Sequence, residues 1–491
     1  MGLSRRKFTK EMNLAAIQQL DMGRRPPRWP EPSKSTQVCC TGGGRKFAMD
    51  RAARFPGVGK RRWDETKVAH LERKVGQQSL EIDFLKRNWP IGILVYDGST
   101  NMLHTGRHFL QIPGPTNVPD RVLRAMAQPT IDHRGPEFAA LGRQVLEGVR
   151  AIFKTSGAVV IFPSSGTGAW EAALINTLSP GDRVLAFEIG EFSRLWTEMA
   201  RRLGLDVEIV PTDWTRGVDP GMVEAKLIED TGKQIRAVMV VHNETSTGST
   251  SQIAAIRRAI DRAGHPALLL VDAVSSLGSI DLRHDEWGID VTVTGSQKGL
   301  MLPPGLGFNA ISEKALAASH NARFAKSYWA WDAMLGPNKT GFFPYTPATN
   351  LLYGLREALA MLQEEGLENV FQRHRLLAEA TRAAVRAWGL EILCRCPEEY
   401  SNVLTTIMLP AGHDADEFRK IVLERFDMSL GAGLGRLKGR AFRIGHLGHF
   451  NELMLAGTLC GVEMGLKLAG VPFSPGGVEA AMASLTTPAA R

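Results

Sequence analysis

After Met102 the chain alternates between short apolar runs and longer segments with helical periodicity, and this alternation limits the folds open to it. The runs are rich in Val, Ile and Leu, which indicates strands that are buried on both faces. They lie at residues 159–162, 184–187, 207–210, 237–241, 268–271, 291–294 and 308–311, with helix-period segments between them such as 191–203, 253–263 and 351–365. Buried strands joined by helices predict an α/β fold with a mostly parallel, seven-stranded sheet.

A different pattern begins near Leu367. A long helical stretch is followed by strand-like segments at 390–393 and 403–408 and by helices near 417–425 and 452–468. This order predicts a small α+β domain over residues 366–474, after a large domain over residues 102–365. We expect the chain after Pro472 to be low in structure, with residues 475–491 as a tail.

The net charge of +8 is concentrated at the N-terminus. Residues 1–90 hold 20 basic and 9 acidic residues (net +11), whereas residues 91–491 hold 39 and 42 (net −3). We therefore treat residues 1–101 as a basic extension, partly disordered where Pro, Gly, Arg and Ser dominate. Apolar residues at heptad spacing predict a helix over about residues 64–89, either as a short coiled coil or packed on its own chain.

Two parts of this extension resemble the small first-frame proteins of insertion-sequence transposases, namely residues 5–11 and residues 55–63 with their continuation through 71–78 and 82–86. Such proteins pair a helix-turn-helix with a leucine zipper. Here a Pro/Gly-rich stretch containing Cys39 and Cys40 stands where the recognition helix should lie. The resemblance implies a fused remnant with Met102 as the ancestral start. DNA binding by the extension stays an alternative, with steep salt dependence as its test.

The number and spacing of the cysteines indicate a reducing compartment. The five of them, at positions 39, 40, 394, 396 and 460, form no CxxC pair and are too few for a disulfide framework, so neither a zinc site nor a thioredoxin-type redox motif is expected. No apolar run approaches the ~18 residues of a membrane span, and no apolar stretch follows the charged start to make a secretory signal. We expect a cytoplasmic protein without a metal and without membrane or nucleic-acid partners.

A loop of small residues follows the first predicted strand, with Ser165, Gly166, Thr167 and Gly168 at the start of a helix. Small residues let backbone N–H groups crowd around an anion, and the helix N-terminus adds its positive end. A phosphate cradle and an ordinary Gly/Ser-rich turn both fit this pattern. The motifs GxGxxG and GxxxxGK are absent, so neither a Rossmann dinucleotide site nor a P-loop is implied.

Two charged residues end other predicted strands. Asp272 follows a wholly apolar strand, and Lys298 lies between small residues after the next one. Taken singly, each is typical of a surface or capping residue. Open α/β sheets bind ligands at the carboxyl ends of their strands, so these two residues and the small-residue loop together favour a ligand site there.

These motifs resemble the class V, fold type I family of pyridoxal-phosphate aminotransferases, most closely the serine–glyoxylate (alanine–glyoxylate) aminotransferases. The matching stretches follow the family order over about residues 102–470: 109–119 (FLQIPGPTNVP), 165–168 (SGTG), 242–248 (HNETSTG), 271–278 (VDAVSSLG), 295–298 (GSQK), 344–350 (PYTPATN) and 442–445 (FRIG). The resemblance implies a fold type I PLP-transferase with pyridoxal 5'-phosphate as cofactor.

The resemblance also assigns roles to residues. Lys298 would be the Schiff-base lysine and the proton shuttle, and Asp272 would keep the pyridine nitrogen protonated. Val274 and Phe192 would pack on the two faces of the ring. The remaining cofactor contacts would be Thr245 at the ring hydroxyl, Ser165, Gly166, Thr167, Gly168 and Gln297 at the phosphate, and Thr346 at the phosphate of the neighbouring subunit.

For the substrate, the resemblance implies that Arg443 clamps a carboxylate with its planar fork. Asn117 and Tyr345 are candidates to contact the amino donor. The implied reaction transfers the amino group of L-serine, or L-alanine, to glyoxylate and yields hydroxypyruvate, or pyruvate, and glycine. Because Thr346 would reach across subunits, we expect a homodimer or homotetramer with shared active sites.

Two alternatives within this fold remain. A cysteine desulfurase would carry a histidine before the lysine and a reactive loop cysteine. Here Gln297 precedes Lys298, and Cys394 and Cys396 fall in the predicted small domain. The other alternative is a folded but inactive relative, in which the basic extension obstructs dimer formation.

Overall fold

The computed structural model of the protein describes residues 106–487. The predictions for the basic extension, including its helix at 64–89 and the start at Met102, lie outside the described residues. Within the described part of the chain, no helix is both long and apolar enough to cross a membrane.

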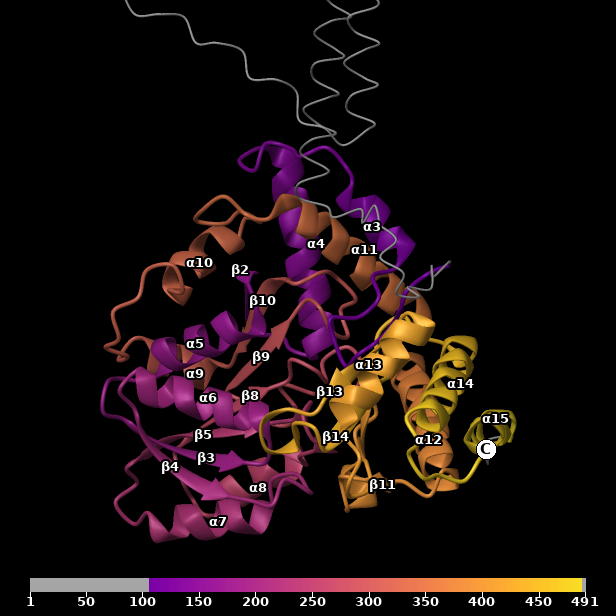
Figure 1. The fold of residues 1–491 in the computed structure, drawn as a ribbon. Coiled ribbons are helices and arrows are strands. Elements are labelled where there is room, and N and C mark those ends of the chain that lie inside the picture. The colour runs from indigo at the N-terminus through magenta and orange to yellow at the C-terminus, as the bar shows by residue number, and fades with distance from the viewer. Residues whose placement is uncertain (1–105, 488–491) are drawn as a thin grey trace, which may run out of the picture. The chain divides into compact units, whose positions relative to one another are not determined.

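The seven strands predicted from apolar runs all form, and they make one sheet in the order β2-β10-β9-β8-β5-β3-β4 (Figure 1). Their bounds are β2 (Ala158–Ser164), β3 (Arg183–Glu188), β4 (Asp206–Pro211), β5 (Ile235–Val241), β8 (Leu268–Asp272), β9 (Val291–Gly295) and β10 (Gly305–Ile311). Neighbouring strands are parallel except at β10, which is antiparallel to both β2 and β9. The prediction of a seven-stranded, mostly parallel sheet is confirmed.

Helices flank this large sheet, and a small hairpin follows β5. The helices are α3 (Asp120–Met126), α4 (Pro136–Phe153), α5 (Gly166–Thr177), α6 (Glu191–Arg202), α7 (Pro220–Glu229), α8 (Ile253–Arg262), α9 (Glu313–Ser319), α10 (Trp331–Asn338) and α11 (Thr349–Glu365), and the hairpin pairs β6 (Asn243–Glu244) with β7 (Ser249–Thr250). Helix α5 packs against β9 and β10, and α6 packs against β3 and β4. The strands between are buried on both faces, which explains their continuous apolar sequences.

A second sheet combines four strands from the C-terminal part of the chain, in orange and yellow in Figure 1, with one strand from residues 109–111. Its order is β1 (Phe109–Gln111), β13 (Met428–Ala432), β14 (Ala441–Gly445), β12 (Leu404–Met408) and β11 (Glu391–Ile392), and its helices are α12 (Leu367–Ala387), α13 (Ala415–Phe426) and α14 (Glu452–Leu468). The predicted segments at 390–393 and 403–408 form β11 and β12. The predicted large domain, residues 102–365, includes strand β1. In the structure β1 instead pairs in parallel with β13 of the small sheet.

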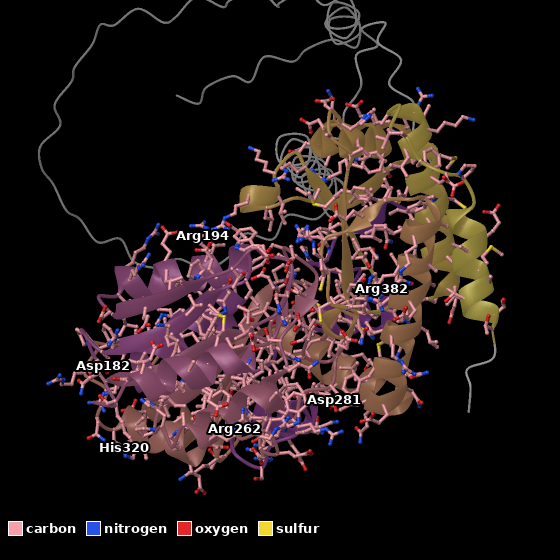
Figure 2. All side chains as sticks on the ribbon, turned by 90° about the horizontal axis from the view of Figure 1, so that it is seen from below. Asp182, Arg194, Arg262, Asp281, His320 and Arg382 are labelled. Carbon is pink, nitrogen blue, oxygen red and sulfur yellow. The ribbon has the colours of Figure 1, made fainter. Side chains whose placement is uncertain are left out.

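A separate hydrophobic core lies between the small sheet and its helices. Arg382 is buried in the same domain. Arg382 on α12 donates from Nη1 to the carbonyl oxygen of Ser401 at 2.8 Å, and its guanidinium lies 5.1 Å from the centroid of the Tyr400 ring. Figure 2 contrasts it with Arg194 on α6 and Arg262 on α8, which lie at the surface. The small domain therefore uses an arginine as an internal hydrogen-bond donor.

The expectation of a low-structure tail is wrong for Gly477–Thr486, which forms helix α15. This helix packs against α12 and α14. Glu463 on α14 accepts hydrogen bonds from Trp388 Nε1 at 2.7 Å and from the Gly477 N–H at 3.2 Å. Short helices depend on tertiary contacts more than on their own sequence, so these contacts explain a helix that the sequence pattern does not indicate.

Candidate active site

The residues singled out at three strand ends lie along one edge of the large sheet. Ser164 ends β2, Asp272 ends β8, and Gly295 ends β9 three residues before Lys298. In the strand registers Ser164 lies opposite Gly305, Gly295 lies opposite Gly307, and Asp272 lies opposite Val293. The structure therefore brings the small-residue loop, Asp272 and Lys298 to the carboxyl edge, as the sequence predicts.

Lys298 is almost fully buried, with 8% of its surface exposed. Its Nζ donates to the carbonyl oxygen of Pro113. Burial and, to a smaller extent, the charge of Arg443 together lower its pKa to about 7, although the charge of Asp272 opposes the shift. Gly114, which follows Pro113, has φ of +104°, and a Cβ at this position would overlap the Lys298 side chain. Glycine is thus required where the chain crosses the lysine.

Asp272 is the acid of this edge and is 4% exposed. Its Oδ1 accepts a hydrogen bond from the backbone N–H of Val274 at 2.7 Å. Burial raises its pKa to about 7, and the charge of Glu244 acts in the same direction, whereas Lys298 favours the ionised form. The buried carboxylate and the buried amine therefore each stabilise the charged form of the other.

The small-residue loop forms the N-terminus of α5. Ser165 is its N-cap and accepts a hydrogen bond from the Gly168 N–H at 3.4 Å, and Thr167 is exposed. Beside it, Oε1 of Gln297 is buried without a hydrogen-bond partner. A methyl group added at Gly295 would lie 2.9 Å from that oxygen and 3.3 Å from the Gly166 nitrogen, so both flank the same space. With its amide turned over, Gln297 would offer N–H donors to an anion at this helix N-terminus.

Three further predicted residues lie around this edge. Val274 is half-buried, and a Cβ at Gly166 would touch its side chain at 2.7 Å. Phe192 is half-buried in the first turn of α6, and Thr245 is 6% exposed in the turn of the β6–β7 hairpin. That hairpin follows β5 directly, and the last residue of β5 pairs with Asp272.

Arg443 comes from the small sheet and reaches the same hairpin. It lies on β14 and is 7% exposed. Its Nε donates to the carbonyl oxygen of Ala432 at 2.7 Å, and its Nη1 donates to that of Thr245 at 2.7 Å. Burial lowers its pKa to about 10, which leaves the guanidinium charged at neutral pH. Arg443 therefore links the small sheet to the β6–β7 hairpin.

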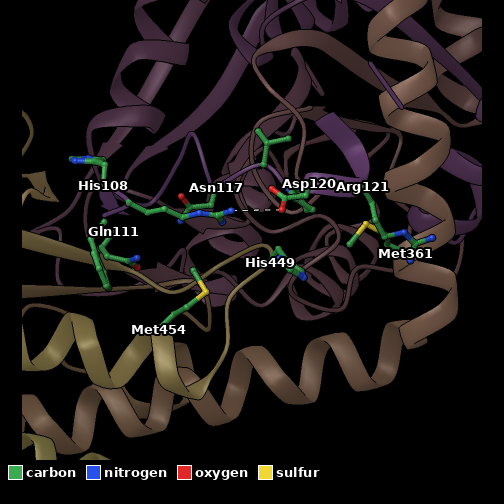
Figure 3. Close-up of a pocket in the computed structure, with 12 residues that line it drawn as sticks. His108, Gln111, Asn117, Asp120, Arg121, Met361, His449 and Met454 are labelled. Carbon is green, nitrogen blue, oxygen red and sulfur yellow. Dashed lines mark ion pairs between the residues drawn. The ribbon is translucent and has the colours of Figure 1, made fainter. Parts of the chain in front are cut away.

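For the three remaining predicted residues, the described chain shows no hydrogen bond to Lys298, Asp272 or Arg443. Asn117 donates from Nδ2 to the carbonyl oxygen of Leu110 at 3.2 Å and lines a separate pocket of about 440 Å³ with His449 and Met454 (Figure 3). Tyr345 stacks on Tyr328 with ring centroids 4.7 Å apart, and its hydroxyl is buried without a hydrogen-bond partner. Thr346 is exposed.

Sequence reasoning missed two elements of the site. The carbonyl of Pro113, which accepts from Lys298, is a backbone group and leaves no mark on side-chain patterns. Glu244 belongs to a motif quoted above but received no role, although it is completely buried. An acid three residues after the apolar strand β5 is a signal similar to the one that identified Asp272 at the end of β8.

Among the cysteines that the structure describes, Cys394 and Cys396 lack the features of a reactive thiol. Cys394 is buried, its Sγ donates to the carbonyl oxygen of Cys396 at 3.6 Å, and burial raises its pKa to about 11. Its neighbour Cys396 also has a raised pKa, because of burial and a hydrogen bond with Glu398. A reactive cysteine needs a lowered pKa, so this geometry disfavours the desulfurase alternative.

The donor set fits one kind of cofactor. The set would suit a cofactor that has an aldehyde, a ring nitrogen and a phosphate: the buried amine could bond the aldehyde, the buried carboxylate could pair with the nitrogen, and the N-terminus of α5, with the Gln297 amide turned over, could bind the phosphate. An α/β sheet edge with this set defines a pyridoxal-phosphate enzyme of fold type I.

The comparisons with known proteins give the family. The model of aminotransferase class-V matches residues 108–434, and the chain belongs to this family of pyridoxal-phosphate aminotransferases. It is 52% identical over 385 residues to the serine--glyoxylate aminotransferase of Methylorubrum extorquens, over 77% of this chain and 96% of that protein. It is 48% identical over 380 residues to the L-aspartate--glyoxylate aminotransferase of Paracoccus denitrificans, over 77% and 96%.

Among solved structures, pyridoxamine-pyruvate aminotransferase from Mesorhizobium loti superposes with a TM-score of 0.73 at 28% identity, over 78% of this chain and 98% of that chain. This likeness confirms the predicted fold type I class. The chain is therefore an aminotransferase, and its cofactor is pyridoxal 5'-phosphate.

Proposed function

We propose that this chain transfers the amino group of L-serine to glyoxylate and releases hydroxypyruvate and glycine. The observation that carries the proposal is the grouping of Lys298, Asp272 and Arg443 in a chain 52% identical to a serine--glyoxylate aminotransferase. Relatives from Arabidopsis thaliana and Hyphomicrobium methylovorum with the same name are each 49% identical. L-Alanine, which would yield pyruvate, is the alternative donor, and the L-aspartate--glyoxylate relative adds a third donor to test.

Lys298 and Asp272 would carry the proton chemistry. When bound, pyridoxal phosphate supplies an electron-withdrawing ring that stabilises negative charge at Cα of the amino acid. Asp272 would keep the ring nitrogen protonated through a charge pair in a buried site. Lys298 would hold the cofactor and move the proton at the substrate Cα. A pKa of about 7 suits this task, because such an amine can both accept and release a proton near neutral pH.

The other residues would orient the two ligands. Phe192 and Val274 would cover the two faces of the ring, and Thr245 would bind the ring hydroxyl. The phosphate would lie at the N-terminus of α5 against Ser165, Gly166, Thr167, Gly168 and Gln297. Arg443 would bind the substrate carboxylate with N–H donors that Ala432 and Thr245 do not use.

A second subunit would complete the site. We propose a homodimer, alone or within a tetramer, in which Thr346 contacts the phosphate bound by the partner subunit. The exposure of Thr346 supports a surface that meets another chain. Tyr345 is favoured over Asn117 as the residue that contacts the amino-donor substrate, because the side-chain amide of Asn117 already donates a hydrogen bond to the carbonyl oxygen of Leu110. The free thiols of the described residues support a cytoplasmic location.

An assay of three donors tests the function. The purified full chain is mixed with glyoxylate and with L-serine, L-alanine or L-aspartate, and the 2-oxo acid products are measured together with the visible absorbance of the cofactor. We expect kcat/KM to be highest for serine. A higher value for alanine or aspartate would reject serine as the preferred donor, and sulfide release from L-cysteine would revive the desulfurase alternative.

A further inference from the structure

Glu244 is a completely buried acid outside the roles described so far. It lies in β6, at the start of the hairpin that carries Thr245. Burial raises its pKa, whereas hydrogen bonds from Ser246, Ser193 and Phe192 favour its ionised form. A buried carboxylate with several donors around it is held in one orientation.

The carboxylate caps helix α6 from outside the helix. The N-cap residue Gly190 has no side chain to accept a hydrogen bond. Glu244 accepts instead, with Oε1 from the Phe192 N–H at 3.3 Å and Oε2 from the Ser193 N–H at 3.0 Å. A Cβ at Gly190 would overlap the Glu244 side chain, so the glycine makes room for it. Negative charge at a helix N-terminus also matches the helix dipole.

Ser246 extends this cap by one residue. Its hydroxyl donates to Glu244 Oε1 at 2.7 Å and accepts from the Glu191 N–H at 2.9 Å. Three consecutive N–H groups of the first turn of α6 are therefore held by Glu244 and Ser246. Phe192 is the middle residue of the three.

The same turn is tied to the small sheet on its other side. The carbonyl oxygen of Thr245 accepts from Arg443 Nη1 at 2.7 Å, and that of Ser246 accepts from Thr406 Oγ1 at 3.4 Å. The charge of Glu244 also favours the charged form of Arg443. Residues 244–246 thus connect Phe192 on one side with Arg443 on the other.

We propose that Glu244 is a positioning residue that, through this one turn, fixes both Phe192 against the cofactor ring and Arg443 against the substrate carboxylate. The proposal rests on the proposed roles of Phe192 and Arg443. Glu244 itself touches neither ligand in this assignment. Its loss should therefore loosen cofactor and substrate binding together.

The test is Glu244→Gln, which keeps the size of the side chain but turns one acceptor into an N–H donor facing the N–H groups of α6. Losing one buried hydrogen bond of this kind corresponds to about a 10-fold change in an equilibrium. We expect amide hydrogen exchange at Phe192 and Ser193 to accelerate by about this factor in the cofactor-free protein. The dissociation constant of pyridoxal phosphate and the KM values of serine and glyoxylate should rise, with a smaller change in kcat.

Glu399→Gln is the matched control, since Glu399 is also buried and its Oε2 accepts from the Gly217 N–H at 2.7 Å, but it makes no contact with α6. It should leave exchange at Phe192 and cofactor binding as in the natural chain. Equal effects of the two variants would overturn the proposal, as would unchanged exchange and cofactor binding in Glu244→Gln. If Glu244→Gln does not fold, Ser246→Ala gives the same readouts, with faster exchange expected at Glu191.

The proposed substrates and the proposed role of Glu244 can be rejected independently of each other. Hydrogen exchange and cofactor binding need no substrate, so they judge the role of Glu244 even if serine and glyoxylate prove not to be the substrates. Conversely, a natural chain that binds the cofactor but does not transaminate serine refutes the proposed donor and leaves the exchange result to decide on Glu244.

Discussion

The carbonyl oxygen of Thr245 accepts a hydrogen bond of 2.7 Å from Nη1 of Arg443. Thr245 lies in the β6–β7 hairpin that follows β5 of the large sheet, whereas Arg443 lies on β14 of the small sheet. A second carbonyl, that of Ala432, accepts from Nε at 2.7 Å. A guanidinium has five N–H donors, so two backbone contacts orient it and leave donors for a ligand. Burial of an arginine without a carboxylate in contact is costly, and a substrate carboxylate would supply the missing charge.

Replacing Arg443 by lysine should weaken the binding of both carboxylate substrates. Lysine keeps the charge but loses the planar fork and the contact that orients it. Hydrogen bonds to charged groups contribute about 1.5–3 kcal/mol each, so we expect kcat/KM for serine and glyoxylate to fall roughly 10- to 100-fold. Steady-state kinetics measure this directly. Arg262→Lys on the surface of α8, where the arginine pairs with Glu224, is the control and should change kcat/KM little.

Much of the large sheet could be predicted because its strands are buried on both faces and therefore read as continuous apolar runs. The small sheet was only partly predictable. Its strand β1 has three residues, β13 (MSLGA) includes serine and glycine, and β14 (AFRIG) includes the functional Arg443. Such short, mixed segments become strands through their partners, which the local pattern does not reveal.

The residues of the site were likewise predictable only where the local sequence pattern reveals them. Asp272 and Lys298 were predictable because they stand at the ends of apolar strands, and the family resemblance supplied their roles. Glu244 carries a similar signal, but its role was not predictable, because its partners are backbone N–H groups of a helix 51 and 52 residues earlier in the chain. The prediction for Asn117 as a substrate contact stays untested, and the structure places it in a different pocket.

Gly114→Ala should disturb Lys298 without unfolding the protein. The new Cβ would overlap the lysine side chain, and the residue has φ of +104°. Left-handed backbone costs an L-residue roughly 1–2 kcal/mol, and a misplaced catalytic group can lower the rate by about 100-fold. Urea unfolding and kcat for the serine reaction measure the two effects.

Gly412→Ala separates the two causes. Gly412 has φ of +90° with nothing within 4 Å of the position of a new Cβ, so it carries the backbone strain without the collision. We expect it to lose a similar amount of stability and to keep its activity. An equal loss of activity in both variants would show that strain alone, and not contact with Lys298, explains the effect of Gly114→Ala.

The folded chain should lose stability in mild acid because of buried histidines. His374 pairs with the carbonyl oxygen of Val370 through Nδ1 at 2.7 Å and accepts from the Gly448 N–H through Nε2 at 3.1 Å, which requires the neutral ring. Burial, aided by the charge of Arg373, lowers its pKa to about 3. In the unfolded chain the pKa is about 6.5, so the unfolded state binds more protons below that pH.

The free energy of unfolding should therefore be unaffected by His374 above pH 6.5 and should fall as the pH drops from about 6.5 towards 3. At pH 5 the expected loss from this residue is about 2 kcal/mol. Urea midpoints at pH 7 and pH 5 measure it in the cofactor-free protein. His374→Gln, which removes the titrating group, should show a smaller difference between the two midpoints, and an equal difference would contradict the assignment.

Hybrid dimers test whether Thr346 acts across subunits. Lys298→Ala should lower kcat by about 10²–10⁴-fold or more, and Thr346→Ala should weaken cofactor binding by roughly 10-fold through the loss of one hydrogen bond to a charged phosphate. A hybrid of the two variants contains one site with both natural residues only if Lys298 and Thr346 come from different subunits. At limiting cofactor the purified hybrid should then recover about half of the natural activity. If the two residues instead belong to one subunit's site, each site of the hybrid carries one substitution, and its activity should not exceed the mean of the two parent variants.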